Sequence, residues 1–262
     1  MRAWIAEKAG PENLKLVNDV PIPEIKGDYD ILVKILTTSI NPVDAYKTSF
    51  GIPNAIIGVD ACGIVQKVGS KVEEDTDVKN GDLVYFLHDA SVPTGTFADF
   101  VVQDARTVGV VPKKFYEGKD INKIAIEFGS FPTVFLTAYW DLVKKAGLTI
   151  FPIEYPSHPK LFKNIVITGA SGGVGSYAVQ LARIYKETLP KEQSEQVRII
   201  GICSTANIDF AKSMGATHMI DYTKENVVER VREITQEEMA DIYVDNIMSY
   251  EQGISCLGYG VH

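Results

Sequence analysis

The glycine-rich segment at residues 168–175, TGASGGVG, has the residue types and spacing that bind phosphate groups. Read from Ala170, it fits the pattern Gly/Ala-x-Gly-x-x-Gly, which marks dinucleotide binding when it joins a strand to a helix. Its small residues let the backbone turn tightly and approach a pyrophosphate, and the first amides of the helix can bind the anion. A glycine turn without a ligand is the alternative. The cofactor contacts are expected from Ser171, Gly172, Gly173 and Val174.

The residues after the next apolar run indicate which dinucleotide this site would take. An NAD site typically places an acidic residue there, which binds the ribose 2′-hydroxyl. Residues 201–207, GICSTAN, contain no acid, and the next one along the chain is Asp209. Because a carboxylate would repel a 2′-phosphate, its absence favours NADPH over NADH. No lysine or arginine stands there either, so only neutral hydrogen bonds are expected, from Ser204, Thr205 and Asn207.

The elements that must position this turn alternate between strand and helix patterns from Lys163 onward. Such alternation indicates a parallel sheet with helices on both faces. The expected strands are residues 165–168, 198–203, 218–222 and 241–245, and the expected helices are residues 174–185, 208–214 and 226–234.

The first half of the chain has a different pattern, in which short β-branched runs recur between turn signals. Strands at this spacing indicate a small barrel or sandwich. The runs are residues 31–36, 63–68, 83–87 and 97–102, with one helical turn at 42–48. The pattern changes around Ile124, a helix is expected at 133–145, and the proline-rich residues 151–159 are expected to form an exposed loop.

Composition limits the class of protein. The chain has 262 residues, of which 45% are hydrophobic and 23% charged, with a net charge of −8. An acidic chain without a basic run repels phosphate backbones, so nucleic acid is not an expected partner. Three distant cysteines fit a reducing compartment. Charges near the N-terminus and within the most apolar stretch, 124–140, argue against a signal peptide or a membrane span. A cytoplasmic protein is expected.

Several short motifs stand in a specific order and spacing. They are residues 41–46 (NPVDAY), 58–65 (GVDACGIV), 81–84 (GDLV), 95–100 (GTFADF), 136–139 (LTAY), 170–175 (ASGGVG), 214–216 (MGA) and 220–222 (IDY). Through them the chain resembles the medium-chain dehydrogenase/reductase superfamily, in its zinc-free quinone oxidoreductase branch. The resemblance implies an α/β protein with a GroES-like β-barrel substrate domain at residues 1–125 and a Rossmann dinucleotide-binding domain, a doubly wound parallel sheet, at 126–262. It also implies a homodimer.

The resemblance bears on metal binding as well. Zinc-dependent relatives carry a cysteine where Asn41 stands, a His-Glu pair where Val59 and Asp60 stand, and a four-cysteine lobe that has no counterpart here. The cysteines and histidines of this chain lack ligand spacing, so no metal is expected. Without a Lewis acid to polarise a simple ketone, the acceptor should be conjugated, a quinone or an α,β-unsaturated carbonyl.

The resemblance also implies roles for single residues. Asn41 and Tyr46 would line the pocket beside the nicotinamide, where a tyrosine hydroxyl can polarise the acceptor oxygen or donate a proton. Asn41 would orient substrate or bond the cofactor ribose; alternatively it caps the turn before Pro42, and Tyr46 packs in the cleft. Thr137 would lie near the nicotinamide and Tyr222 at the adenosine end, unless the first only packs in its helix and the second is a strand-end aromatic.

Two departures from the family pattern stand out. The family continues with Val-Gly after the position of Asp245, whereas this chain has Asn246-Ile247-Met248. The chain also ends near Gly260, before the last strands of a six-stranded doubly wound sheet, so the Rossmann domain is expected to be truncated.

Two classes of function follow. The leading hypothesis is an NADPH-dependent reductase of quinones or activated enones. The alternatives are a non-catalytic NADPH-binding protein with a regulatory or stabilising role, and an inactive truncated form.

Overall fold

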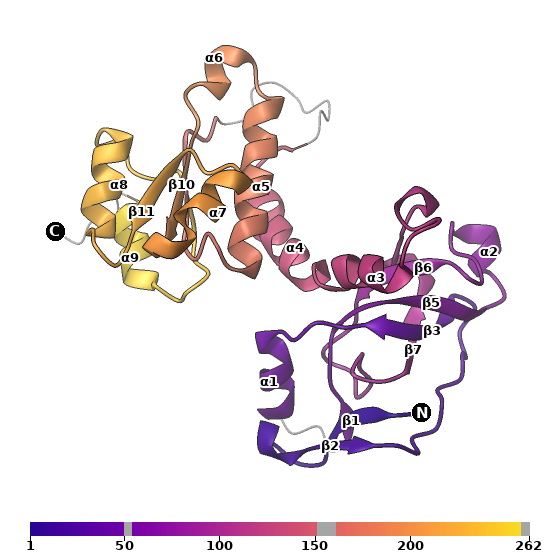
Figure 1. Ribbon diagram of the computed structural model, residues 1–262. Helices are drawn as coiled ribbons and strands as arrows, with labels where there is room; N and C mark the ends of the chain where they lie inside the picture. The colour runs from indigo at the N-terminus through magenta and orange to yellow at the C-terminus, as the bar shows by residue number, and fades with distance from the viewer. Residues whose placement is uncertain (50–53, 151–160, 258–262) are drawn as a thin grey trace. The chain divides into compact units, whose positions relative to one another are not determined.

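The computed structural model describes residues 1–49, 54–150 and 161–257. They form two compact units, Met1–Thr133 and Val134–His262 (Figure 1). The helix α4 (Pro132–Tyr139) runs across the division. The sequence pattern changes near residue 125, ahead of this division. Within the described residues, no helix is both long and apolar enough to cross a membrane.

The first unit contains two sheets. The larger is antiparallel, with strand order β7-β3-β5-β6-β8, and the smaller has the order β2-β1-β4. The strands of the larger sheet are β3 (Asp30–Thr37), β5 (Asp60–Val68), β6 (Leu83–Leu87), β7 (Phe100–Asp104) and β8 (Gly109–Val110). Those of the smaller sheet are β1 (Ala3–Ala6), β2 (Leu14–Val17) and β4 (Ala55–Ile56).

Strand β5 shows how the larger sheet obtains its two apolar faces. Successive side chains of a strand point to opposite faces. Ala61 and Val65 pack with Ile31 and Phe86 in one cluster. Cys62, from the same strand, packs in another cluster with residues of helix α3.

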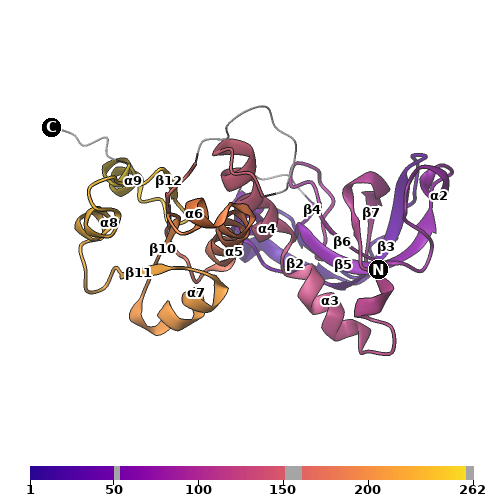
Figure 2. The same ribbon diagram turned by 90° about the horizontal axis from the view of Figure 1, so that it is seen from above.

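Helix α3 (Ile121–Gly129) lies against the larger sheet (Figure 2). It begins where the Asp120 carboxylate accepts the Asn122 N–H at 3.0 Å, which satisfies one of the unpaired amides of the first turn. The other short helical elements of this unit are η1 (Pro11–Asn13), α1 (Pro42–Ser49), α2 (Val72–Asp75), η2 (Ala105–Thr107) and η3 (Lys113–Phe115).

The second unit is a parallel sheet with the strand order β11-β10-β9-β12, which is the 3-2-1-4 portion of a doubly wound fold. Its strands are β9 (Asn164–Ile167), β10 (Arg198–Cys203), β11 (His218–Asp221) and β12 (Ile242–Val244). Its helices are α5 (Gly173–Thr188), α6 (Lys191–Ser194), α7 (Ile208–Met214), α8 (Val227–Thr235) and α9 (Tyr250–Cys256), with a π-helix η4 (Trp140–Lys145) and a 3₁₀ turn η5 (Thr205–Asn207).

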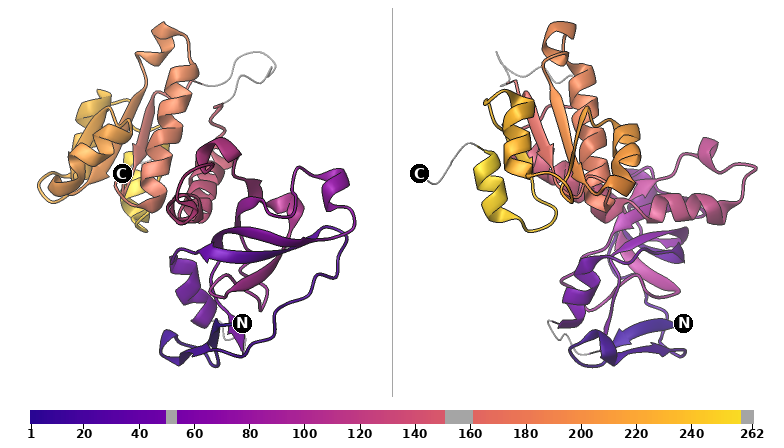
Figure 3. Two further views of the ribbon diagram at one scale, coloured as in Figure 1. Left: turned by 45° about the vertical axis from the view of Figure 1, so that its right-hand side comes forward. Right: turned by 60° about the vertical axis from the view of Figure 1, so that its left-hand side comes forward.

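Helices cover both faces of this sheet. The yellow helices α8 and α9 lie on one side, and the orange helices α5 and α7 lie on the other (Figure 3). Ile165 and Ile167 of β9 pack toward α5 and α7. Val166, between them, packs toward α8. All three are fully buried, as expected for a strand of a parallel sheet that is covered on both faces.

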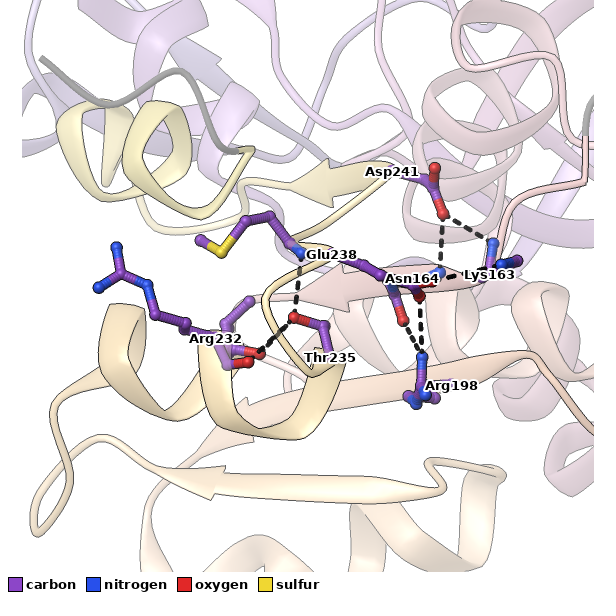
Figure 4. Close-up of polar contacts among 9 residues, drawn as sticks. Lys163, Asn164, Arg198, Arg232, Thr235, Glu238 and Asp241 are labelled. Atoms are coloured by element: carbon purple, nitrogen blue, oxygen red, sulfur yellow. Dashed lines mark hydrogen bonds and ion pairs between the residues drawn. The ribbon is translucent and has the colours of Figure 1, made fainter.

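Polar contacts join the amino ends of these strands (Figure 4). The Asp241 carboxylate accepts the N–H groups of Lys163 and Asn164 at 2.7 and 3.0 Å. Arg198 donates to Asn164 Oδ1 at 2.9 Å and lies 3.4 Å from Glu238. Lys163 and Arg198 also hold the pKa of the Glu238 carboxyl below its ordinary value, Lys163 having the larger effect. Hydrogen bonds and ion pairs within the chain therefore occupy the amino ends of these strands, and a ligand is expected at their carboxyl ends.

Most of the predicted elements occur, with differences at their ends. Strands β6 and β10 and helix α7 have the predicted bounds, whereas β7 begins at Phe100 and not at Phe97. The predicted helix at 133–145 is two elements, α4 and a π-helix. The prediction missed the smaller sheet and the helices α3 and α9. The expected loop at 151–159 lies outside the described residues.

Candidate functional site

The glycine turn after β9 has a geometry that favours glycine at position 169 and requires it at position 175. Gly169 has φ +55°, in the left-handed region. Gly172 N–H donates to Gly169 O at 2.8 Å and closes the turn. A Cβ on Gly175 would lie 2.1 Å from Gly169 O, so this position requires close approach of helix and turn.

Helix α5 starts at Gly173 directly after this turn. Its N-cap residue is Gly172, whose position provides no side-chain cap. The first amides of a helix have no partner within the helix, and a 16-residue helix carries a positive partial charge at this end. These amides are suited to a pyrophosphate.

A cavity of about 420 Å³ lies at the carboxyl ends of β9 and β10. It is lined by Gly169, Ser171, Gly172, Ile202, Cys203, Ser204, Asn207, Tyr222 and Ile247. Strand β9 has β10 on one side and β12 on the other. The strands that follow β9 in the chain are therefore added first on one side of it and then on the other, so the strand order reverses at this point. Ligands of open α/β sheets bind at such a point.

The structure brings five of the predicted cofactor residues to this one cavity: Ser171, Gly172, Ser204, Asn207 and Tyr222. Gly173 and Thr205 are chain neighbours of the lining residues Gly172 and Ser204 but do not line the cavity. Val174 does not line it either, and Thr137 is exposed on α4. The sequence reasoning missed Gly169, Ile202, Cys203 and Ile247. Ile202 and Cys203 end a predicted strand, and because ligands of such sheets bind at the carboxyl ends of the strands, that position could have identified both as lining residues.

An acidic residue, Asp221, ends β11 and directly precedes the lining residue Tyr222. The Asp221 carboxylate is buried and accepts hydrogen bonds from Thr205 Oγ1 and, at 2.6 Å, from Thr223 Oγ1. The Thr205 bond contributes most to lowering the pKa of Asp221 to about 2. Lys224 Nζ lies 3.6 Å from Asp221. Asp221 and Lys224 lie at and after the end of β11, whereas the sequence was inspected for an acid or a cation only directly after β10.

The loop after β12 closes another side of the cavity. Asn246 N–H and Nδ2 donate to Thr168 Oγ1 and O, each at 2.8 Å, and so attach the loop to the end of β9. Met248 has φ +59° and an 86% exposed side chain. A non-glycine residue thus takes a left-handed conformation where the chain departs from the Val-Gly pattern.

In the first unit, the buried carboxylate of Asp60 joins residues from three segments. Ser39 Oγ and Asn41 Nδ2 donate to Asp60 Oδ2 at 2.5 and 2.8 Å. Thr133 donates to Oδ1 from its backbone N–H at 2.8 Å and from Oγ1 at 2.7 Å. Asp60 is 0% exposed, so these bonds replace its hydration. Sequence reasoning did not identify Asp60 as a site residue.

The candidate residue Asn41 directly precedes α1, and Tyr46 is the fifth residue of that helix. Asn41 is buried, and its backbone N–H donates to Asp44 Oδ2 at 2.7 Å. The carboxylate of Asp44, whose pKa burial raises, therefore caps this helix start. The Asn41 side chain, which was the alternative cap, instead donates to Asp60. Tyr46 is 51% exposed. Lys47 is buried and donates to Thr94 O at 2.7 Å.

Cysteines and histidines of the described residues are used in packing and hydrogen bonding. Burial raises the pKa of the Cys62 thiol to about 12, which keeps it protonated and unreactive. His88 is buried, and its ring nitrogens pair with Gln103 Oε1 and Thr94 Oγ1. In the part of the chain that the structure describes, no group of three or more His, Cys, Asp or Glu residues could hold a metal ion.

Two family models match the chain, one within each of its two units. Residues 27–113 match the alcohol dehydrogenase GroES-like domain, and residues 173–260 match the family model described as zinc-binding dehydrogenase. The chain is 31% identical over 260 residues to a zinc-type alcohol dehydrogenase-like protein of Schizosaccharomyces pombe, covering 94% of this chain and 66% of that protein. It is 32% identical over 238 residues to 2-methylene-furan-3-one reductase of Solanum lycopersicum, covering 86% and 53%.

Among solved structures, quinone oxidoreductase of Escherichia coli in complex with NADPH is similar, with a TM-score of 0.73 and 25% identity, covering 98% of this chain and 70% of that one. The expected architecture, a GroES-like domain followed by a Rossmann-like parallel sheet, is confirmed. The chain spans about half to two thirds of the length of the two curated relatives.

Proposed function

This chain belongs to the medium-chain dehydrogenase/reductase superfamily as a quinone oxidoreductase-like member, and from that premise we propose that it is an NADPH-dependent oxidoreductase that reduces a quinone or an α,β-unsaturated carbonyl without zinc. The observation that carries the proposal is the cavity at the glycine turn, with uncapped amides of α5 at its edge. A similar solved structure binds NADPH, and a relative reduces a conjugated ketone, as its name states.

The residues present fit a dinucleotide. Gly169 has the positive φ that glycine favours, a side chain on Gly175 would block the close approach of helix and turn, and the α5 amides suit the pyrophosphate. Ser171, Gly172, Gly173 and Val174 would hold the pyrophosphate region. Ser204, Thr205, Asn207 and Tyr222 would hold the adenosine end, and Thr137 the nicotinamide end. In this proposal residues 126–262 serve the dinucleotide and residues 1–125 the substrate.

The proposed chemistry needs a hydride and a proton. NADPH, when bound, supplies the hydride. The proton comes from water or from the hydroxyl of Tyr46, which is exposed on α1 and can also polarise the acceptor oxygen. Conjugation lets the acceptor take a hydride without a metal, and Asn41 stands where zinc-dependent relatives have a ligand. Asp60 uses its carboxylate for four hydrogen bonds within the chain, which supports a zinc-free site.

Thermal unfolding of the 262-residue chain with NADPH, NADH or no nucleotide tests the first part. At a hundredfold excess over Kd, a ligand that binds only the folded state stabilises it by about 2.7 kcal/mol. We expect a larger shift in Tm with NADPH than with NADH, followed by NADPH oxidation with a benzoquinone or an alkenone. No shift with either nucleotide would refute the proposal for this chain.

A non-catalytic NADPH-binding protein is the second candidate, and the loop after β12 favours it. Met248, which follows the lining residue Ile247, is exposed with φ +59°, in the loop where this chain departs from the Val-Gly pattern of the family. This candidate predicts an NADPH shift without turnover on any quinone or enone. Turnover in the same preparation would eliminate it.

The setting is proposed as a cytoplasmic homodimer that binds neither nucleic acid nor membrane. The three cysteines are buried and unpaired, which supports a reducing compartment. Sedimentation equilibrium tests the dimer, and a mass of 28.8 kDa at micromolar concentration would refute it.

A further inference from the structure

We infer that Asp221 and Thr205 are positioning residues that hold together the two loops at the proposed adenosine end of the cavity, and that Thr205 does not itself touch the cofactor. One loop follows β10 and contributes Ser204 and Asn207 to the lining, and the other follows β11 and contributes Tyr222. The inference rests on the proposed function and changes the role of Thr205 within it.

The two loops are joined by a hydrogen bond between side chains. Thr205, the first residue of η5, donates its hydroxyl to Asp221 Oδ2 across 16 residues of chain. Asp221 ends β11, which pairs with β10 in parallel, and Cys203 and Asp221 are register partners. The contact therefore bridges the carboxyl ends of two neighbouring strands, next to the residues that line the cavity.

The other carboxylate oxygen of Asp221 is used within its own loop. Asp221 Oδ1 accepts the N–H of Thr223 at 3.0 Å and the Thr223 hydroxyl at 2.6 Å. These two bonds close a turn around Tyr222. Tyr222 is thus fixed to Asp221 by local contacts, and the Thr205 hydroxyl is the side-chain donor that ties Asp221 to the loop after β10.

Thr205 has a single hydroxyl proton, and Asp221 accepts it. Hydrogen bonds, that of Thr205 above all, lower the pKa of the buried Asp221 carboxyl to about 2, so near neutral pH the carboxylate can only accept. The Thr205 oxygen is left with acceptor capacity alone, which a phosphate group cannot use. Within the described part of the chain, Ser204 Oγ accepts Asn207 Nδ2 at 3.3 Å and has no acceptor for its own proton, which is left for a ligand.

The bond between the loops acts before a ligand arrives. Thr205 and Tyr222 are both exposed, so burial does not fix them, and loops that a ligand must order reduce its affinity. The bond to Asp221 sets the separation of the lining residues whether or not the ligand carries a 2′-phosphate. Loss of the bond should therefore weaken NADPH and NADH alike, whereas loss of a direct contact would weaken only the nucleotide that makes it.

The chain offers a matched pair of variants. Thr205→Val and Thr223→Val each remove one hydroxyl donor from Asp221 and keep the shape of the side chain. Thr223→Val retains the backbone N–H bond to Asp221 Oδ1, so the turn around Tyr222 remains, whereas Thr205→Val breaks the bond between the loops. A third variant, Thr205→Ser, keeps the hydroxyl and should behave as the natural chain does.

The first experiment uses the full nucleotide-free chain and needs no activity. The carboxyl ¹³C shift of Asp221 is followed from pH 7 to the onset of acid unfolding. We expect Asp221 to begin to take up a proton about 1 pH unit higher in Thr205→Val than in the natural chain or in Thr205→Ser, as the loss of one hydrogen bond to a charged group predicts. An unchanged titration in Thr205→Val would overturn the inference, because the bond between the loops would then be absent in solution.

The second experiment measures Kd for NADPH and for NADH with each full-length variant. Thr205→Val should weaken both nucleotides about tenfold, as one lost hydrogen bond predicts. Thr223→Val and Thr205→Ser should leave both values within about twofold of those of the natural chain. Weakening of one nucleotide alone would overturn the inference, since Thr205 would then contact the 2′-phosphate or the ribose hydroxyl directly. Equal weakening by Thr205→Val and Thr223→Val would also overturn it.

The two experiments separate failure of the inference from failure of the proposed function. A natural chain that binds neither nucleotide would refute the proposed function, and the positioning role with it. A natural chain that binds NADPH, with variants that do not follow the expected order, would refute the positioning role alone.

Discussion

The first unit positions its candidate groups with side-chain hydrogen bonds around a buried carboxylate, whereas the glycine turn of the second relies on glycines and backbone amides. Asp60 has four donors from three residues and no exposed surface. The turn before α5 has no side-chain cap and depends on the absence of Cβ atoms. A side-chain site fails when a partner is removed, and a backbone site fails when an atom is added.

The largest effect is expected from Asp60→Ala, which breaks the side-chain site. Removing the carboxylate leaves buried donors of Ser39, Asn41 and Thr133 without partners, which should cost about 4 kcal/mol of unfolding free energy. Urea denaturation measures it. The control is Asp28→Ala, which removes an exposed carboxylate paired with Lys71 at 3.0 Å and should change stability little. Similar losses for both variants would contradict the comparison.

Gly175→Ala adds an atom to the backbone site. The new Cβ would lie 2.1 Å from Gly169 O, and because both groups belong to the backbone, α5 must move. We expect a loss of about 2 kcal/mol in stability and the loss of the NADPH-dependent shift in Tm. In the matched variant Gly172→Ala, the Cβ would meet the same oxygen at 3.2 Å, with an ordinary φ of −80°. If both variants bind NADPH equally, the close approach does not matter.

Met248→Gly should sharpen the comparison in the opposite direction. Met248 has φ +59°, a conformation that costs residues with a Cβ about 1 kcal/mol, and its side chain is almost fully exposed. Glycine removes that strain, so we expect a gain of up to about 1 kcal/mol after the greater entropy of the unfolded chain is counted. Calorimetry measures the change in Tm. A destabilised variant would show that the methionine side chain makes contacts that outweigh its backbone strain.

The smallest effect concerns pH, and its sign differs between two carboxyls, Asp221 in the second unit and Asp44 in the first. Hydrogen bonds lower the pKa of Asp221 from 3.8 to about 2, so its contribution to stability is present above pH 3.8 and is lost as the pH falls toward 2. Burial raises the pKa of Asp44, so its contribution grows as the pH falls toward 3.8. Carboxyl ¹³C shifts followed from pH 7 to pH 2 measure both titrations. Midpoints of Asp44 and Asp221 on the same side of 3.8 would refute the contrast.

The same difference explains what the sequence could predict. The glycine turn is readable because all of its determinants lie within residues 168–175, and a strand and a helix flank it. Strand β10 was predicted with its bounds because the five residues after Arg198 are a continuous run without polar side chains, which a buried parallel strand requires. Four lining residues of the cavity, Ser171, Gly172, Ser204 and Asn207, follow from that local order, and the fifth, Tyr222, follows from the family resemblance.

The Asp60 contacts could not be predicted in this way. Its partners lie 19, 21 and 73 residues away, and none of those separations leaves a periodic pattern. The smaller sheet was missed for the same reason. Strand β1 pairs with β4 some fifty residues later, and its exposed Trp4 and buried Ala3 and Ala6 do not follow the usual alternation of large apolar residues inside. Sequence separation, and not weak interaction, hid these features.

The proline that opens α1 has a consequence for the chemical ageing of the protein. Asparagine deamidates when the backbone nitrogen of the next residue attacks its side-chain carbonyl, and Pro42 has no N–H to do so. Pro42 therefore protects the Asn41 side chain from deamidation. Asn80 is exposed and is followed by Gly81, which has φ +89° and open space around it. On prolonged storage, peptide mapping should find aspartate at position 80 long before position 41.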